Sequence, residues 1–187
     1  MIFLKNIVII GPAHPLRGGI AAFNERLAGA LLEAGYHVRI ETFSLQYPGF
    51  LFPGKTQYSA SPPPDVPDIC VSVNSVNPFN WMRTGKKIRN EKPDMILTAF
   101  WMPFMGPCLG TLAGIIRKNR HSKVVALVHN FIPHEKHPGD KAFTRYFSRR
   151  MDGYIAMSKA VLKDIQSFDK SKPAVFSPHP LYDHYGK

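Results

Sequence analysis

The clearest chemical signal in the first part of the chain is the glycine pair Gly18 and Gly19, in the segment GPAHPLRGGIAAF. The pair follows a short apolar run and directly precedes a helical pattern. Glycines at such a place let the backbone approach an anion closely, and the amides and dipole at the start of a helix favour a phosphate group. His14 and Arg17 lie in the same segment and could assist.

The spacing of these glycines restricts the chemistry. It matches neither the GxGxxG fingerprint nor a P-loop, because no GK[ST] follows, so hydride transfer and ATP hydrolysis lose support. A tight turn before a helix would need the same glycines. Phosphate binding and a purely structural turn therefore both remain open.

A second candidate, His129, stands at the end of the apolar run in VVALVHNFIPHE. Ligands of open α/β sheets bind outside the carboxyl ends of the strands, so this position favours a functional role. A core histidine whose hydrogen bonds are made by the backbone is the alternative. Trp101 follows another apolar run, and could either shape the floor of a cleft or fill space beneath a loop.

His134, Glu135 and His137 raise the question of a metal site. The run HEKH is one residue short of the HExxH spacing, and Lys136 within the cluster would oppose a cation. We therefore expect no metal at this site.

These residues need a framework, and the pattern of the chain indicates one. Short apolar runs alternate with longer helical patterns, which is typical of a parallel sheet covered by helices. Several runs consist of Val, Ile and Leu, as expected of strands buried on both faces. We expect an α/β fold with a Rossmann-like parallel sheet and helices on both faces. The expected strands are residues 6–10, 37–43, 69–73, 94–99, 123–129, 153–157 and 174–177.

Helix signals separate these strands. The first helix starts near Gly19, repeats apolar residues at helical spacing and closes at Gly35. The second begins with Asn77 as N-cap and Pro78 at its first position. The remaining helices follow Pro103, Asp140 and Ser158, and the last of them ends around Phe168.

Two segments show neither the periodicity of a strand nor that of a helix. Residues 44–68 are rich in proline and aromatic residues, and we expect a long loop of the kind that is usually functional or disordered. Residues 179–187 resemble the start of an interdomain linker. We therefore expect a single domain over residues 1–178.

Residues 95–116 carry no charge and are long enough to cross a bilayer. Pro103 and Pro107 interrupt the stretch, so we expect a buried strand followed by a helix instead of a membrane span. Gly106, Gly110 and Gly114 recur at four-residue spacing. We interpret them as the face on which this helix approaches the sheet.

The chain is strongly basic, with 24 Lys and Arg, 13 Asp and Glu and a formal net charge of +11, so its surface should attract phosphates. Solvated helix faces explain such clusters, and docking on the anionic inner face of a membrane is the functional alternative. No zinc finger, RNP motif or helix-turn-helix signature is present, so we expect no nucleic-acid partner. The clusters are Arg83, Lys86, Lys87, Arg89 and Lys92, and Lys141, Arg145, Arg149 and Arg150.

The cysteines indicate the compartment. Cys70 and Cys108 are the only two, and they form neither a CxxC motif nor a disulfide framework. A reducing environment is the simplest interpretation. We expect a cytoplasmic protein, peripheral on the inner membrane face if the basic clusters dock there.

Four segments together resemble glycosyltransferase family 4, whose members have the two-domain GT-B architecture. The paired glycines, the helix after them and the run HVRIETF resemble its opening, and KPDMILTAFWMPF resembles its fourth strand and the loop that follows. VVALVHNFIPHE resembles the strand whose terminal histidine lines the active site, and DGYIAMSKAVLKDI resembles the next strand and its Ser-capped helix. The order and spacing of these segments extend the resemblance over nearly the whole chain.

The resemblance implies a retaining transfer of a sugar from a nucleotide-diphosphate sugar to a hydroxyl acceptor, a glycan or a lipid-linked molecule, without a metal or other cofactor. It places the donor phosphates and sugar against Gly18 and Gly19, and the reacting sugar against His129. It further assigns His14 and Arg17 to the donor side, and Asn130, His134, Glu135 and Trp101 to the acceptor side.

In the resembled family a second domain holds the nucleotide and supplies a pair of glutamates. We therefore expect this chain to be the N-terminal, acceptor-side half, missing a C-terminal donor-binding domain, inactive alone and used in polysaccharide biosynthesis. Two alternatives remain open. One is half of a nucleotide-sugar epimerase, and the other is a non-catalytic basic module that binds membranes or nucleic acid.

Overall fold

The computed structural model describes residues 6–48, 57–59, 62, 64, 68–132 and 138–178. Within these ranges the chain forms a seven-stranded sheet in the order β3-β2-β1-β4-β5-β6-β7, with every neighbouring pair parallel. The predicted α/β fold with a Rossmann-like parallel sheet is confirmed. The strands are β1 (Asn6–Ile10), β2 (His37–Leu45), β3 (Ile69–Asn74), β4 (Met95–Phe100), β5 (Lys123–Val128), β6 (Gly153–Ala156) and β7 (Ala174–Phe176).

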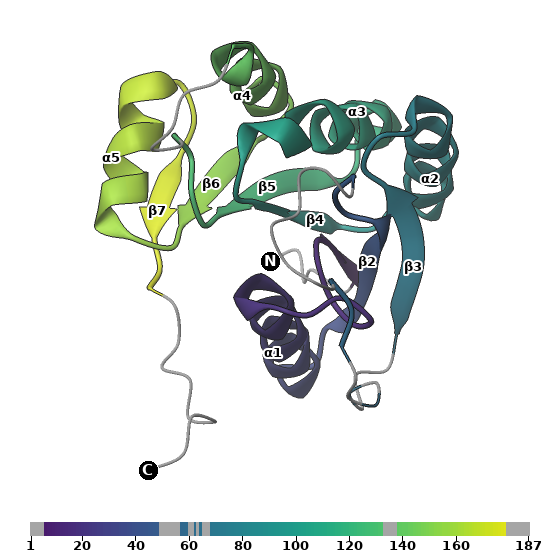
Figure 1. The fold of residues 1–187 in the computed structure, drawn as a ribbon. Helices are drawn as coiled ribbons and strands as arrows, with labels where there is room; N and C mark the ends of the chain where they lie inside the picture. The colour runs from purple at the N-terminus through teal and green to yellow at the C-terminus, as the bar shows by residue number, and fades with distance from the viewer. Residues whose placement is uncertain are drawn as a thin grey trace.

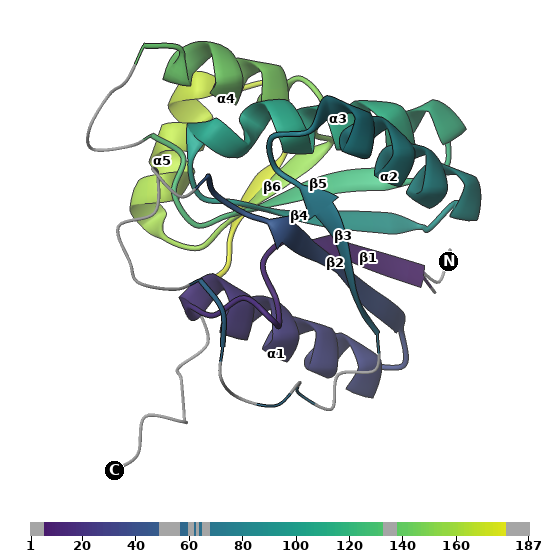
Figure 2. The same ribbon diagram turned by 45° about the vertical axis from the view of Figure 1, so that its right-hand side comes forward.

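Helices cover both faces of the sheet, but unequally, as Figure 1 and the turned view in Figure 2 show. Of the α-helices in the described residues, one lies on one face and four lie on the other. Parallel crossovers are right-handed, so the connection from β1 to β2 and the connections that run the opposite way along the sheet place their helices on opposite faces. The single helix is α1 (Gly19–Glu33), and the four are α2 (Pro78–Glu91), α3 (Gly106–Ile116), α4 (Asp140–Ser148) and α5 (Lys159–Phe168).

An apolar cluster fills the space on each side of the sheet. Successive residues of a strand point to opposite faces. Val8 and Ile10 therefore belong to the larger cluster beneath the four helices, and Ile7 and Ile9 belong to the smaller cluster beneath α1. Both faces of β1 are buried, which explains why its sequence is a continuous apolar run.

The predicted strands are confirmed, with differences of one or two residues at their ends. β2 continues to Leu45 because it keeps pairing with β3 as far as Asn74, across an irregular register. β4 ends at Phe100 and β5 at Val128, so His129 is the first residue after its strand.

The predicted helix caps are also confirmed. The Asn77 side chain accepts hydrogen bonds from the backbone amides of Phe79 (3.0 Å) and Asn80 (3.2 Å) at the start of α2. Ser158 accepts one from the amide of Val161 (3.1 Å) at the start of α5. Short polar side chains at these positions satisfy amides that have no partner inside the helix.

The glycine face of α3 is where the interpretation of the sequence was wrong. We expected Gly106, Gly110 and Gly114 to let this helix approach the sheet, but they face α4. A Cβ on Gly106 would lie 2.5 Å from the backbone oxygen of Phe143, and one on Gly110 would lie 2.8 Å from the ring of Tyr146. The four-residue spacing identifies a close contact without identifying the partner, since a sheet and a helix require the same small residues.

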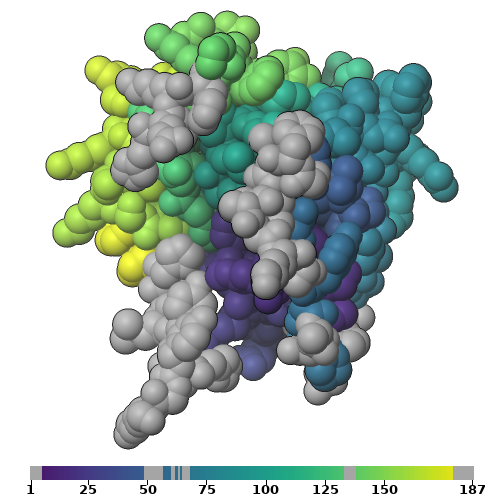
Figure 3. All heavy atoms as spheres, viewed as in Figure 1, coloured from purple at the N-terminus to yellow at the C-terminus, as the bar shows by residue number. Residues whose placement is uncertain are grey.

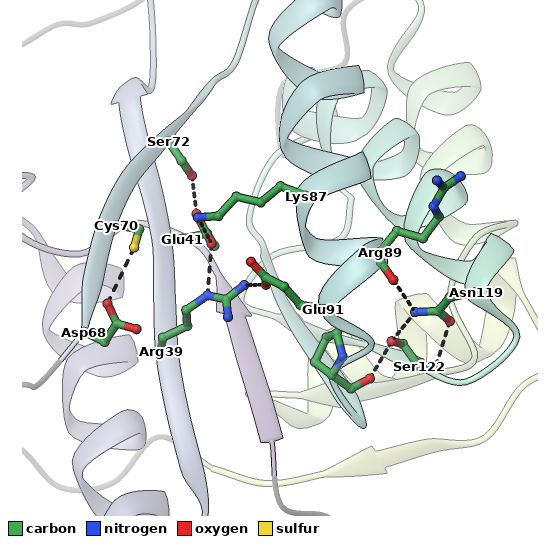
Figure 4. A network of polar contacts seen from close by, with 11 residues as sticks. Arg39, Glu41, Asp68, Cys70, Ser72, Lys87, Arg89, Glu91, Asn119 and Ser122 are labelled. Carbon is green, nitrogen blue, oxygen red and sulfur yellow. Dashed lines mark hydrogen bonds and ion pairs between the residues drawn. The ribbon is translucent and has the colours of Figure 1, made fainter.

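A buried carboxylate ties the edge of the sheet to α2. Glu41 of β2 is fully buried and contacts Arg39 (3.0 Å), Lys87 (3.4 Å) and the hydroxyl of Ser72. Figure 4 shows Arg39 between Glu41 and Glu91 of α2. Burial would lower the pKa of Arg39, but the carboxylates of Glu91 and Glu41 outweigh it and raise that pKa. A buried charge is tolerated when it is paired in this way.

The long connection between β2 and β3 contains no helix or named strand among the residues that are described there. Tyr58 in this connection forms an isolated bridge with Leu16. No helix in the described part of the chain combines the length and apolar character needed to cross a membrane. The predicted linker, residues 179–187, lies outside the described residues.

Candidate functional site

Buried side chains of β2 and α1 form hydrogen bonds with the backbone of the loop between β1 and α1. Thr42 of β2 accepts a hydrogen bond from the amide of Ala13 (2.9 Å) and donates one to its carbonyl oxygen (3.1 Å). Asn24 of α1 is fully buried and donates to the carbonyl oxygen of Pro12 (2.8 Å). Gly11 makes this approach possible, because a Cβ there would lie 2.6 Å from the Asn24 side-chain nitrogen.

The same loop is held further along by Glu25 and by a second segment. The Glu25 carboxylate accepts a hydrogen bond from the amide of His14 at 2.7 Å. Burial raises the pKa of Glu25, against the opposing effect of that hydrogen bond. On the other side, the amide of Arg17 donates to the carbonyl oxygen of Gln57 (2.9 Å), and the amide of Ser59 donates to that of Pro15 (2.8 Å).

This anchoring presents the glycine pair at the surface. Gly18 has φ 128° and ψ 169°, a backbone conformation that residues other than glycine rarely adopt. It is the N-cap of α1, and no side chain of a described residue forms a capping hydrogen bond there. Gly18 and Gly19 are both exposed. An open pocket of about 320 Å³ lies beside them, lined by His14, Leu16, Arg17, Gly18, Ala21, Ala22, Glu25, Ser59, Pro62 and Pro64.

His129 lies on the α1 side of the sheet. Its amide donates to the carbonyl oxygen of Phe100 at 2.9 Å, and its half-buried ring packs edge-on against Phe23, with ring centroids 5.1 Å apart and planes at 87°. Phe23 is one turn into α1 from Gly19. Phe23 thus connects the imidazole to the glycine-capped helix start at the carboxyl edge of the sheet.

Trp101 follows β4 at the same edge but packs toward the opposite face. Its indole nitrogen donates to the hydroxyl of Tyr47, and its ring lies 6.1 Å from Phe43 and 6.4 Å from Tyr47 between centroids. Burial raises the pKa of Tyr47, so this hydroxyl stays protonated. The contacts are those of an aromatic plug beneath a loop, and the Trp101 ring remains partly exposed.

The remaining predicted site residues are only partly covered by the structure. Asn130 directly follows His129 and is half-buried. His134 and Glu135, and with them His137, lie outside the described residues. Among the residues that are described, no group of three His, Cys, Asp or Glu side chains lies close enough to hold a metal ion.

The anchoring residues were not identified from the sequence. Thr42 lies in a strand that mixes polar and apolar residues, and Asn24 and Glu25 lie between the apolar positions Phe23 and Leu27 of an amphipathic helix. A polar residue on the buried side of a strand or helix must find a hydrogen-bond partner. The polar residues at buried positions of this strand and helix were therefore the sequence feature that could have identified them. The nearest backbone in need of partners is the irregular loop before α1.

The fold and this site can be compared with known proteins. A model of Glycosyltransferase Family 4 matches residues 17–182. Among curated proteins, none matches the chain. One similar solved structure is an α-glucosyltransferase in complex with UDP, with a TM-score of 0.58 and 12% identity over 95% of this chain and 45% of that one.

Another is an α-glucosyltransferase in complex with UDP and a 13-mer DNA containing an HMU base, with a TM-score of 0.59 and 12% identity over 93% of this chain and 42% of that one. These neighbours are glycosyltransferases of the GT-B type. At such identities the likeness concerns the fold, and the chain spans less than half the length of the solved structures. The family match over residues 17–182 of 187 shows that the chain belongs to glycosyltransferase family 4.

Proposed function

We propose that this chain is the acceptor-side half of a retaining glycosyltransferase, which moves a sugar from a nucleotide-diphosphate sugar to a hydroxyl group of a glycan or a lipid-linked acceptor. One observation carries the proposal. In a family 4 chain, His129 packs against Phe23 of the helix whose start is capped by Gly18, so an imidazole and a helix N-terminus share one sheet edge.

The helix start suits the donor diphosphate. Leaving-group departure builds negative charge on the diphosphate, and backbone amides with the positive end of a helix dipole stabilise such charge. Gly18 and Gly19 offer no Cβ that would keep a phosphate away, and nothing lies within 4 Å of a Cβ built at either position. Arg17 is exposed beside them, and His14 lines the adjoining pocket.

His129 suits the reacting sugar. The transition state of such transfers resembles an oxocarbenium ion, and its stabilisation depends on polar groups held in fixed positions. The hydrogen bond from the His129 amide to the carbonyl oxygen of Phe100 and the edge-on contact with the Phe23 ring hold this imidazole in position. In the proposal His129 contacts the sugar as a polar partner, and the chemistry needs no metal.

The acceptor residues are assigned from the family resemblance and from their positions in the sequence, directly after β4 and β5. We place it against Asn130 and Trp101, together with His134 and Glu135 of the following loop. The solved neighbours were obtained with UDP, which supports a nucleotide sugar as donor. Since the chain spans less than half of those structures, the nucleotide itself is assigned to a second domain facing this edge.

The test is sugar transfer by the longest natural polypeptide that contains the chain. It is incubated with radiolabelled nucleotide-diphosphate sugars and, separately, with glycan and extracted-lipid acceptors, in the presence and absence of EDTA. The proposal requires labelled acceptor that forms with EDTA present, and an unchanged anomeric configuration in the product by NMR. Conversion of the donor to its epimer without transfer would favour the epimerase alternative and contradict the proposal.

Two substitutions should affect this activity differently. His129→Ala removes the group beside the reacting sugar and is expected to lower kcat by about 100-fold or more, with a smaller effect on KM. Gly18→Ala places a side chain at φ 128° and should mainly raise KM for the donor. Gly29→Ala on the same helix is the matched control, because a Cβ there meets nothing within 4 Å, and it should leave both constants near wild type.

A further inference from the structure

The outward side of α2 exposes large apolar side chains next to basic ones. Phe79 is 79% exposed and Met82 is 41% exposed, and Val76 in the preceding turn is 43% exposed. Arg83 and Lys86 are exposed on the same helix. We call Val76, Phe79, Met82, Arg83 and Lys86 the outer stripe of α2.

The helical spacing places these side chains together. Phe79, Met82, Arg83 and Lys86 are three, four and seven residues apart, so they share one side of the helix. The buried residues of α2, which are Thr84, Gly85 and Ile88, fall on the opposite side. Figure 3 shows the α2 segment at the molecular surface.

The charge around the stripe is mainly positive. Glu91 is the only acidic residue of α2, and it is paired with Arg39 at the far end of the helix. The neighbouring α3 and α4 lie in the same layer of helices, and α4 and the turn after α3 add exposed cations. These further cations are Lys118 in the turn after α3, Arg145 in α4 and Arg149 directly after α4.

We propose that the outer stripe of α2 docks on an anionic lipid bilayer. A helix that lies in the membrane interface inserts an apolar side and keeps cations at the level of the headgroups, and each Lys or Arg near an anionic surface adds to the attraction. Phe79, Met82 and Val76 supply the apolar side, and Arg83 and Lys86 supply the cations. A nucleic-acid duplex would satisfy the cations but would leave most of the apolar surface in water.

The position of α2 gives this docking a consequence that rests on the proposed function. β3 and β1 run parallel within the sheet, so α2 begins at the carboxyl edge where Gly18 and His129 lie. Docking through the start of α2 would bring that edge close to the lipid surface. A lipid-linked acceptor would then reach the site without leaving the bilayer.

The test is co-sedimentation of the chain with vesicles of phosphatidylcholine containing about 30% phosphatidylglycerol, a content chosen to give a clearly negative surface. We expect binding to these vesicles at low salt, weaker binding at high salt and little binding to phosphatidylcholine alone. This assay needs no sugar transfer, so its failure would leave the transferase proposal standing. Conversely, an inactive transferase that still binds would leave the docking proposal standing.

Variants separate the two parts of the stripe. Phe79→Ser should lower vesicle binding by about tenfold, Phe79→Trp should restore it, and the double change Arg83→Glu with Lys86→Glu should lower it by tenfold or more. Two matched controls lie elsewhere on the surface. They are Val175→Ser on β7, where the side chain is 55% exposed, and Lys159→Glu with Lys163→Glu on α5.

Folding of every variant is verified by its thermal unfolding transition. The proposal is overturned if anionic vesicles do not bind the chain, or if the α5 and β7 controls lose as much binding as the stripe variants. It is also overturned if a DNA duplex binds through Arg83 and Lys86 while vesicles do not.

Discussion

Glu25 lies half-buried beneath the loop that carries the glycine pair, and its carboxylate accepts the amide hydrogen of His14. Burial disfavours the charged form of the carboxyl and so raises its pKa. The hydrogen bond needs only an acceptor oxygen, which an amide also provides. Charge and shape can therefore be separated at this position.

Glu25→Gln should keep the acceptor and remove the buried charge. Because the pKa of Glu25 is raised in the folded protein, ionisation favours the unfolded chain, and wild type should lose stability relative to the variant as the pH rises through that raised pKa. Below the unfolded pKa of about 4.3 the difference should be constant. Urea unfolding of both proteins between pH 4 and about 8 measures it, and a difference independent of pH would contradict the assignment.

The candidate site residues could be selected from the sequence, but the residues that hold them in place could not. Gly18, Gly19 and His129 could be selected because they stand where a strand ends or a helix begins. Thr42 and Asn24 could not, because a polar residue within a strand or helix does not indicate which backbone group it will contact.

Among the elements, α3 and α4 make the closest helix contact for which the reason is visible. Tyr146 of α4 lies over Gly110, its hydroxyl lies 3.0 Å from that of Thr111, and the Arg150 guanidinium lies 5.4 Å from the Tyr146 ring centroid. A larger side chain would not fit at Gly106 or Gly110, because the atoms that face these glycines include backbone atoms of α4, which cannot move easily.

Gly106→Ala is therefore expected to destabilise the fold by about 1–3 kcal/mol, since its Cβ would clash with the backbone of Phe143. Gly29→Ala is the same substitution in α1 with open space around it, and should stabilise by about 0.5–1 kcal/mol. Chemical denaturation of the two variants tests the pair. Equal effects would mean that helix propensity, and not the α4 contact, governs both positions.

A second element-level contact joins α5 to β6. Burial alone would raise the pKa of Asp169, but hydrogen bonds from Ser171 and Tyr154 and the Lys172 ammonium group outweigh it and lower that pKa to about 2. The Tyr154 hydroxyl lies 2.9 Å from the carboxylate. A carboxyl with a lowered pKa stabilises the fold above its unfolded pKa, and this contribution disappears as the pH falls toward 2.

Asp169→Asn should accordingly cost about 1–2 kcal/mol at pH 7, and the cost should shrink between about pH 4 and pH 2. Urea midpoints across that range give the measurement. Asp164→Asn on α5 is the matched control and should change stability less. A cost for Asp169→Asn that persists at pH 2 would assign it to packing instead of charge.

The whole molecule follows from the alternation of strands and helices, and that alternation was readable in the sequence. Strand positions and caps came from apolar runs and from Asn77 and Ser158. The pairing order was not readable, because it depends on contacts between residues far apart in the chain. The uneven covering of the sheet, with α1 alone on one face, is a consequence of that order.

The order also predicts where the molecule opens most easily. β1 is paired on both sides and buried on both faces, whereas β7 is an edge strand of three residues with Val175 and Phe176 exposed. Amide hydrogen exchange should therefore be slowest in β1 and β4 and fastest in β7 among the strands. Comparable rates for β1 and β7 would show that the sheet opens only as a unit.

The central position of β1 has a consequence for biosynthesis. β1 is synthesised before the other strands of this sheet, yet one of its edges pairs with β4, where Ile7 lies opposite Met95. A nascent chain must carry the segment NIVII with that edge unsatisfied until the ribosome has released β4. During this interval the growing polypeptide offers chaperones an unpaired apolar segment.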